Sequence, residues 1–99
     1  MSETVLRLSY VGLVQNITGK WQEEILLEEK KTVRELLNVL IERYGEDFRF
    51  SLLTHEGNLR PSARVLLAED SSEGATLDAE VMPGTNMTVA LVVYGPEGG

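Results

Sequence analysis

One stretch of the sequence, residues 32–44, carries the period and both end signals of a single amphipathic helix. Its large apolar residues recur at the i, i+3, i+4, i+7, i+8 and i+11 positions of one helix face: Val33, Leu36, Leu37, Leu40, Ile41 and Tyr44. Thr32 and Glu35 have the spacing of a capping box at the start, and Gly45 follows as a stop signal. A helix with one apolar stripe must pack that stripe against another layer, so this segment requires a partner sheet or further helices.

Strand patterns on both sides of this segment supply the second layer. Apolar and polar residues alternate over 4–11 and resume over 21–28, and the turn-like residues 12–20 between them predict a hairpin. Residues 64–68 and 88–94 are apolar on both faces, which predicts internal strands and places the last strand in the sheet centre. One face of the second strand carries Trp21, Glu23, Ile25 and Leu27, and for Trp21 we expect core or sheet-surface packing rather than a role as a contact aromatic.

The order of these elements predicts an α+β fold of the β-grasp (ubiquitin-like) type. In this fold, a mixed four- to five-stranded sheet would be covered on one face by one main helix, at about residues 32–44. The last strand would lie between the N-terminal hairpin and the later strands. We expect one β-grasp domain over residues 1–94, followed by a flexible tail at 95–99 that has nothing to pack.

The composition argues against several classes of function. Nine Lys and Arg stand against sixteen Asp and Glu, and this net charge of −7 argues against nucleic-acid binding and favours a basic protein partner. Cysteine is absent and His55 is the sole histidine, so we expect neither thiolate chemistry nor a metal site. No serine, histidine and acid combine into a catalytic motif, which argues against an enzyme. Because neither a signal peptide nor a membrane-span pattern occurs, we expect a cytoplasmic protein with no membrane partner.

Several segments resemble the MoaD/ThiS sulfur-carrier family, which includes ubiquitin-related modifiers. They are the helix start Thr-Val-Arg-Glu-Leu-Leu at 32–37, the strand at 64–68, Pro-Gly-x-x-Met-Thr-Val-Ala-Leu at 83–91, and the terminal Gly98-Gly99. Gly-Gly alone is weak evidence, but directly after the last strand of a β-grasp domain it is informative. Thr85 stands where many members carry Asp, so these residues do not assign a subfamily.

The resemblance implies that Gly99 carries the acyl group. A MoeB/ThiF-like enzyme would use ATP to adenylate the Gly99 carboxylate, and sulfur would then give a thiocarboxylate, or a lysine amine an amide. The chain itself has no P-loop or other ATP-binding motif, so no cofactor is expected to bind to it. Glycine permits the extended threading of Gly98 and Gly95 into a narrow channel, and Pro96 stiffens the root of the tail.

Several alternatives stay open. A sulfur donor for molybdopterin, thiamin or tRNA thiolation, with a synthase large subunit as a further partner, competes with a modifier that is joined to target-protein lysines. The rival from another class is a β-grasp interaction module or subunit with an inert tail. In each case the docking surface is expected on the exposed sheet face near the tail, with these residues at its centre: Leu53, Leu66, Val92 and Tyr94.

Overall fold

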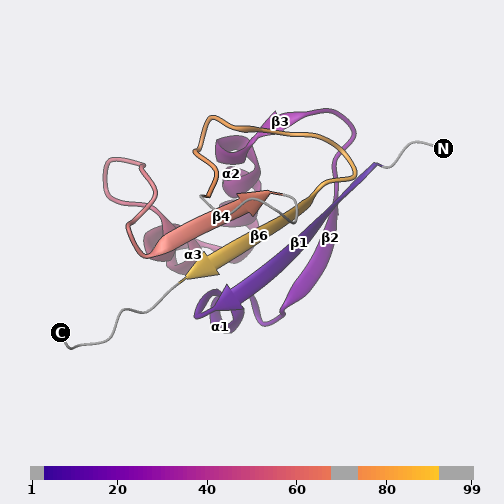
Figure 1. Cartoon of the computed structure of the whole chain (residues 1–99). Coiled ribbons are helices and arrows are strands. Elements are labelled where there is room, and N and C mark those ends of the chain that lie inside the picture. Colours follow the sequence, from indigo (N-terminus) through magenta and orange to yellow (C-terminus); the bar gives the residue numbers. More distant parts are fainter. Residues whose placement is uncertain (1–3, 68–73, 92–99) are drawn as a thin grey trace.

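The predicted hairpin and the last strand assemble into a mixed sheet with the strand order β2-β1-β6-β4 (Figure 1). The structure, a computed structural model, describes residues 4–67 and 74–91. Strand β1 (Val5–Gly12) runs antiparallel to β2 (Gln22–Leu26) and parallel to β6 (Asn86–Leu91). Strand β4 (Ala63–Leu67) closes the other side of β6 in an antiparallel pairing. The predicted central position of the last strand is therefore confirmed.

The core lies between this sheet and the helix α2 (Val33–Tyr44), which covers its inner face (Figure 1). The alternation of β1 puts Leu6, Leu8 and Tyr10 on that face, where each is at most 1% exposed. The helix contributes its own apolar stripe to the same core, with these residues fully buried: Val33, Leu36, Leu37 and Leu40.

The capping box predicted for this helix is present. The amide of Glu35 donates to Thr32 Oγ1 over 3.2 Å, and the amide of Thr32 donates to Glu35 Oε1 over 2.9 Å. Gly45 ends the helix at φ +91° and donates its N–H to the carbonyl of Ile41. The backbone amides of Val33 and Arg34 bond to a later segment, residues 77–79, so the start of α2 is held by tertiary structure as well.

Two short helices occupy segments for which no helix was expected. The predicted turn at 12–20 contains α1 (Val14–Thr18), which Gly19 ends at φ +77°. The apolar residues after Gly45 form α3 (Glu46–Leu52), whose buried side chains, Phe48 and Leu52, are one helical turn apart. A small two-stranded ribbon, β3 (Lys31–Thr32) with β5 (Glu80–Val81), lies beside the start of α2.

The prediction of an internal strand at 64–68 is wrong in one respect, because β4 is an edge strand of the sheet. Its inward residue Val65 is fully buried, as the apolar pattern required. Its outward residue Leu66 is half-buried, although β4 has a described neighbouring strand, β6, on one side only. An apolar residue on the outer face therefore does not by itself indicate a strand inside the sheet. The strand also starts one residue earlier than expected, at Ala63, and its expected last residue, Ala68, lies outside the described residues.

Candidate functional site: the end of β6 and the sheet around it

The candidate site begins at Leu91, the last residue of β6. Leu91 is the last described residue and sits between Gly12 of β1 and Ala63 of β4, its register partners on either side. Leu91 therefore lies in the interior of the sheet, at the end where β1 also finishes (Figure 1). The predicted site residues beyond this point lie outside the described residues: Val92, Tyr94, Gly95, Pro96, Gly98 and Gly99.

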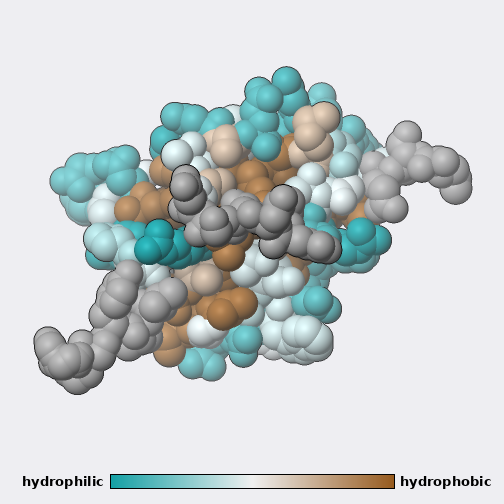
Figure 2. All heavy atoms as spheres, viewed as in Figure 1, coloured by the Kyte–Doolittle hydropathy of each residue, from teal (hydrophilic) through white to brown (hydrophobic). Residues whose placement is uncertain are grey.

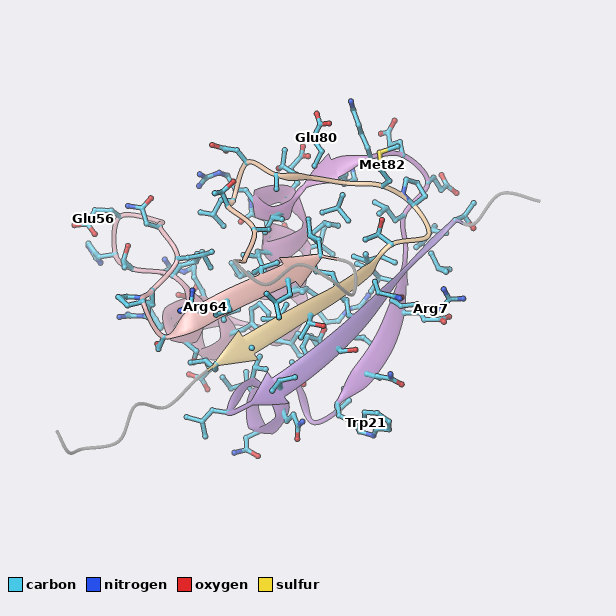
Figure 3. All side chains as sticks on the ribbon, viewed as in Figure 1. Arg7, Trp21, Glu56, Arg64, Glu80 and Met82 are labelled. Atoms are coloured by element: carbon cyan, nitrogen blue, oxygen red, sulfur yellow. The ribbon has the colours of Figure 1, made fainter. Side chains whose placement is uncertain are left out.

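The outer sheet face beside this exit carries a partly apolar surface. Ala90 of β6 has Val11 and Arg64 as its register partners, and the neighbouring pair joins Thr88 to Leu66. Val11 is 50% exposed, and Leu66 is half-buried. Brown, hydrophobic residues show on this face near the ends of β1 and β6 (Figure 2), and Arg64 borders them on β4 (Figure 3). We call these five residues the exit face.

Leu53 does not belong to the exit face, and its expected place on the exposed sheet surface is wrong. It directly follows α3 and packs beside Leu37 and Ile41 of α2, in a groove of about 230 Å³ on the helical side of the sheet. Residues 46–52 form a helix and not a strand, so the chain reaches Leu53 on the inner side. The structure consequently does not bring Leu53 and Leu66 together.

Trp21 also departs from expectation. It precedes the first residue of β2 and is 65% exposed, with its side chain directed away from the sheet (Figure 3). Its carbonyl still accepts the amide of Tyr10, which keeps the hairpin paired up to this point.

A polar cluster that was not predicted lies inside the same end of the sheet. Glu23 of β2 points inward with an 8% exposed side chain, and its Oε2 accepts the hydroxyls of Tyr10 and Tyr44. Its Oε1 accepts Arg43 Nη1 over 3.0 Å and Lys20 Nζ over 3.3 Å. We call these five residues the Glu23 cluster. It joins the β1–β2 hairpin to the end of α2.

The environment of this cluster determines its ionisation. Burial raises the pKa of the Glu23 carboxyl, but the hydrogen bonds from Tyr10, Tyr44 and Lys20 together outweigh burial and leave that pKa below its usual value. Burial, followed by the hydrogen bond and charge of Glu23, raises the pKa of Tyr10 well above its usual range. The Glu23 carboxylate, with its lowered pKa, thus accepts hydrogen bonds from two tyrosine hydroxyls and two cationic side chains.

The described part of the chain also bears on two other features, a metal site and a membrane-spanning helix. Over residues 4–67 and 74–91, no group of three or more His, Asp and Glu side chains is placed to hold a metal ion. His55 is exposed in a turn, as predicted. No described helix is long and apolar enough to cross a membrane.

Solved structures of similar fold cover almost the entire chain. Urm1 from Trypanosoma brucei superposes with a TM-score of 0.76 at 16% sequence identity, covering 96% of this chain and 99% of that one. Small archaeal modifier protein 1 from H. volcanii gives a TM-score of 0.75 at 16% identity, covering 91% and 99%. The chain has the β-grasp fold.

A third β-grasp neighbour carries the provisional name molybdopterin converting factor, subunit 1, and comes from Pyrococcus furiosus. Its TM-score is 0.69 at 19% identity, with 91% of this chain and 99% of that one covered. No protein-family model and no curated protein matches the sequence. The predicted fold class is thus confirmed by structure, at identities where sequence alone gives no match.

Proposed function

We propose that this protein is a ubiquitin-like sulfur carrier or protein modifier whose working end is the Gly99 carboxylate. The observation that carries the proposal is the position of β6, a central strand whose continuation leads within eight residues to Gly98-Gly99. Proteins of the same fold include one titled a small archaeal modifier and one named as a subunit of a converting factor, which supports both a carrier role and a partner protein.

The chemistry begins with activation of a poor acyl donor. An oxygen of the Gly99 carboxylate attacks the α-phosphorus of ATP, and pyrophosphate leaves, which gives an acyl-adenylate. Hydrosulfide then attacks the acyl carbon, the bond to AMP breaks, and a thiocarboxylate, AMP and a proton result. A lysine amine attacking the same carbon gives an amide, AMP and a proton instead. ATP is bound and used by a MoeB/ThiF-like adenylating enzyme, and the carrier itself holds no cofactor.

Glycines suit this reaction because of their small size. A chain that enters a narrow channel in an extended form cannot carry bulky side chains past the walls, and Gly95, Gly98 and Gly99 have no Cβ. Pro96 lacks an amide hydrogen and has a restricted φ, so this residue type favours an extended backbone before the reactive end.

The exit face is where we place docking of the activating enzyme. It adjoins the point from which the tail departs, and it combines exposed Val11 and half-buried Leu66 with small Ala90 and Thr88 between them. Such an apolar centre with a polar rim is typical of protein interfaces. The net charge of −7 favours a partner that is basic overall, whereas the exit face itself carries the exposed cation Arg64. Val92 and Tyr94 come one and three residues after Leu91 in the sequence and would extend the same contact.

The experiment is intact-mass analysis of the protein isolated from its own host. A thiocarboxylate replaces one oxygen of Gly99 with sulfur and adds about 16 Da, whereas a modifier appears as adducts on lysines of other proteins. The same measurement establishes whether Gly99 is the mature C-terminus, which the proposal requires.

A deletion of Gly98-Gly99 separates the proposal from its rival, a β-grasp interaction module with an inert tail. ATP–pyrophosphate exchange by the host's adenylating enzyme should depend on the wild-type chain and disappear with the deletion. Full cellular function of the deletion variant would favour the interaction module.

A further inference from the structure

Gly12 occupies an unusual position at the root of the tail. It is the last residue of β1, has φ +81°, and is the register partner of Leu91 at the end of β6. A Cβ built on Gly12 would lie 2.2 Å from the carbonyl oxygen and 3.3 Å from the carbonyl carbon of Leu91. Real Cβ atoms essentially never approach another heavy atom within 3.0 Å, so any side chain at Gly12 forces a movement.

The atom in the way belongs to the backbone, and a rotamer change cannot relieve the clash. Leu91 is paired with Ala63 of β4 on its other side, so the strand cannot simply shift sideways. Its carbonyl would have to turn or retreat by about 0.8 Å to restore a 3.0 Å contact. That carbonyl belongs to the planar peptide unit that joins Leu91 to residue 92, so turning it also turns the bond to residue 92.

We propose that Gly12 is a positioning residue for the Gly99 carboxylate. Its missing side chain lets the end of β6 lie against the β1–α1 corner and thereby sets the direction of the tail. This inference rests on the proposed function, because direction matters only if the tail must enter a partner's channel. A misplacement of about 1 Å remote from the reacting atoms can lower a rate on the order of a hundredfold.

The chain offers a matched control for the test. Gly19 has a similar φ of +77°, yet a Cβ built there meets nothing within 4 Å. Gly12→Ala and Gly19→Ala therefore share the backbone strain of a positive φ, and only the Gly12 variant adds the clash with Leu91. Gly12→Asn and Gly19→Asn form a second pair, because Asn tolerates positive φ better than Ala while still carrying a Cβ.

The experiment measures ATP–pyrophosphate exchange by the host's adenylating enzyme against the concentration of each full-length variant, at a temperature where all are folded. We expect kcat to fall on the order of ten- to a hundredfold in both Gly12 variants, with a smaller change in KM, because the exit face itself is intact. Both Gly19 variants should stay close to the wild type. The ¹³C resonance of the Leu91 carbonyl should move in the Gly12 pair only, a readout that lost stability alone would not produce.

Each remaining outcome counts against the inference in a distinguishable way. Equal kinetics in the Gly12 and Gly19 pairs would overturn the role of Gly12 and leave the proposed function standing. Folded Gly19 variants beside two unfolded Gly12 variants would show that Gly12 acts on stability and not on the tail. A wild-type protein that supports no exchange would refute the proposed function, and this inference with it.

Discussion

Replacing Glu23 by Gln removes the charge on which the Glu23 cluster depends. The carboxylate accepts hydrogen bonds on both oxygens inside the domain, with a side chain only 8% exposed. A Gln side chain has one accepting oxygen, and its NH₂ group would face donors that Glu23 now satisfies. The variant should keep the fold, because its volume is unchanged, but lose much of the stabilisation.

The magnitude follows mainly from the tyrosines. The cations Lys20 and Arg43 are 45% and 47% exposed, so solvent screens their ion pairs and each contributes little. Hydrogen bonds from Tyr10 and Tyr44 to a charged, buried acceptor are worth about 1.5–3 kcal/mol each when one partner is removed. Because Gln retains part of this bonding, we expect a loss of about 2 kcal/mol in the free energy of unfolding. That loss corresponds to a Tm lower by roughly 8–16 °C in a domain of this size.

Urea unfolding followed by circular dichroism measures this loss, and Glu24→Gln provides the control. Glu24 is the next residue on the same strand and carries the same charge, but it is 57% exposed and pairs with Arg7 on the outer face. Its replacement should cost less than about 1 kcal/mol. If the two variants unfold at the same urea concentration, the buried carboxylate does not stabilise the hairpin against α2 and the reasoning fails.

The pH dependence of this loss has a definite sign. Hydrogen bonds hold the pKa of Glu23 below its usual value of 4.5, so its stabilisation is fully present above that pH in the wild type. It is lost as the pH falls through the lower, folded-state pKa. The difference between wild type and Glu23→Gln should therefore be constant from about pH 6 to 7 and shrink below about pH 4.5. A difference that grows on acidification would contradict the assignment.

Further predictions concern the start of α2, the core side of α3 and the exit face. Thr32→Ala should lower the free energy of unfolding by about 1 kcal/mol in urea, because the capping box loses its acceptor. Leu52→Ala should lower it by about 2–5 kcal/mol, whereas Phe50→Ala, 47% exposed on the same helix, should cost far less. Leu66→Asp should raise the KM of the adenylating enzyme for this protein roughly tenfold. Leu26→Asp, on the same face but at the opposite end of the sheet and 68% exposed, should not raise it.

The elements that the sequence predicted are those whose signals are local. Helix α2 has its period and both caps within residues 32–45, so it could be placed almost to the residue. Helix α1 could not be predicted in this way, because Val, Asn, Ile and Thr are weak helix formers and a helix of five residues is not stable alone. Helix α3 was not predicted because the exposed Phe50 lies between the buried Phe48 and Leu52, so the apolar residues do not show the spacing of one helical face.

The features of the candidate site also differ in whether a local sequence signal predicts them. The terminal Gly-Gly and the apolar Leu66 can each be recognised within a short segment of sequence. The Glu23 cluster, by contrast, brings together residues 10, 23 and 44, which are distant in the sequence and meet only in the folded domain. One signal was available, since Glu23 shares the alternating face of Ile25 and Leu27, which are both buried. An acid among inward positions indicates buried partners, but the sequence does not say which side chains supply them. The close approach of Gly12 to Leu91 depends on the register of two parallel strands, so the sequence could not predict it either.

The Glu23 cluster and Gly12 lie at the same end of β1, two residues apart in the chain at Tyr10 and Gly12, yet they act on different properties. The cluster bonds the hairpin to α2 on the inner face, and Gly12 meets the end of β6 in the plane of the sheet. Glu23→Gln should therefore lower Tm and leave kcat of adenylation unchanged at temperatures where the protein is folded. Gly12→Asn should lower kcat even at temperatures where it is folded, while its clash with the Leu91 carbonyl also places its Tm below that of Gly19→Asn. If Glu23→Gln lowered kcat as much as Gly12→Asn does, the orientation of the tail would depend on the rigidity of the whole β1 end, and the assignment to Gly12 alone would be wrong.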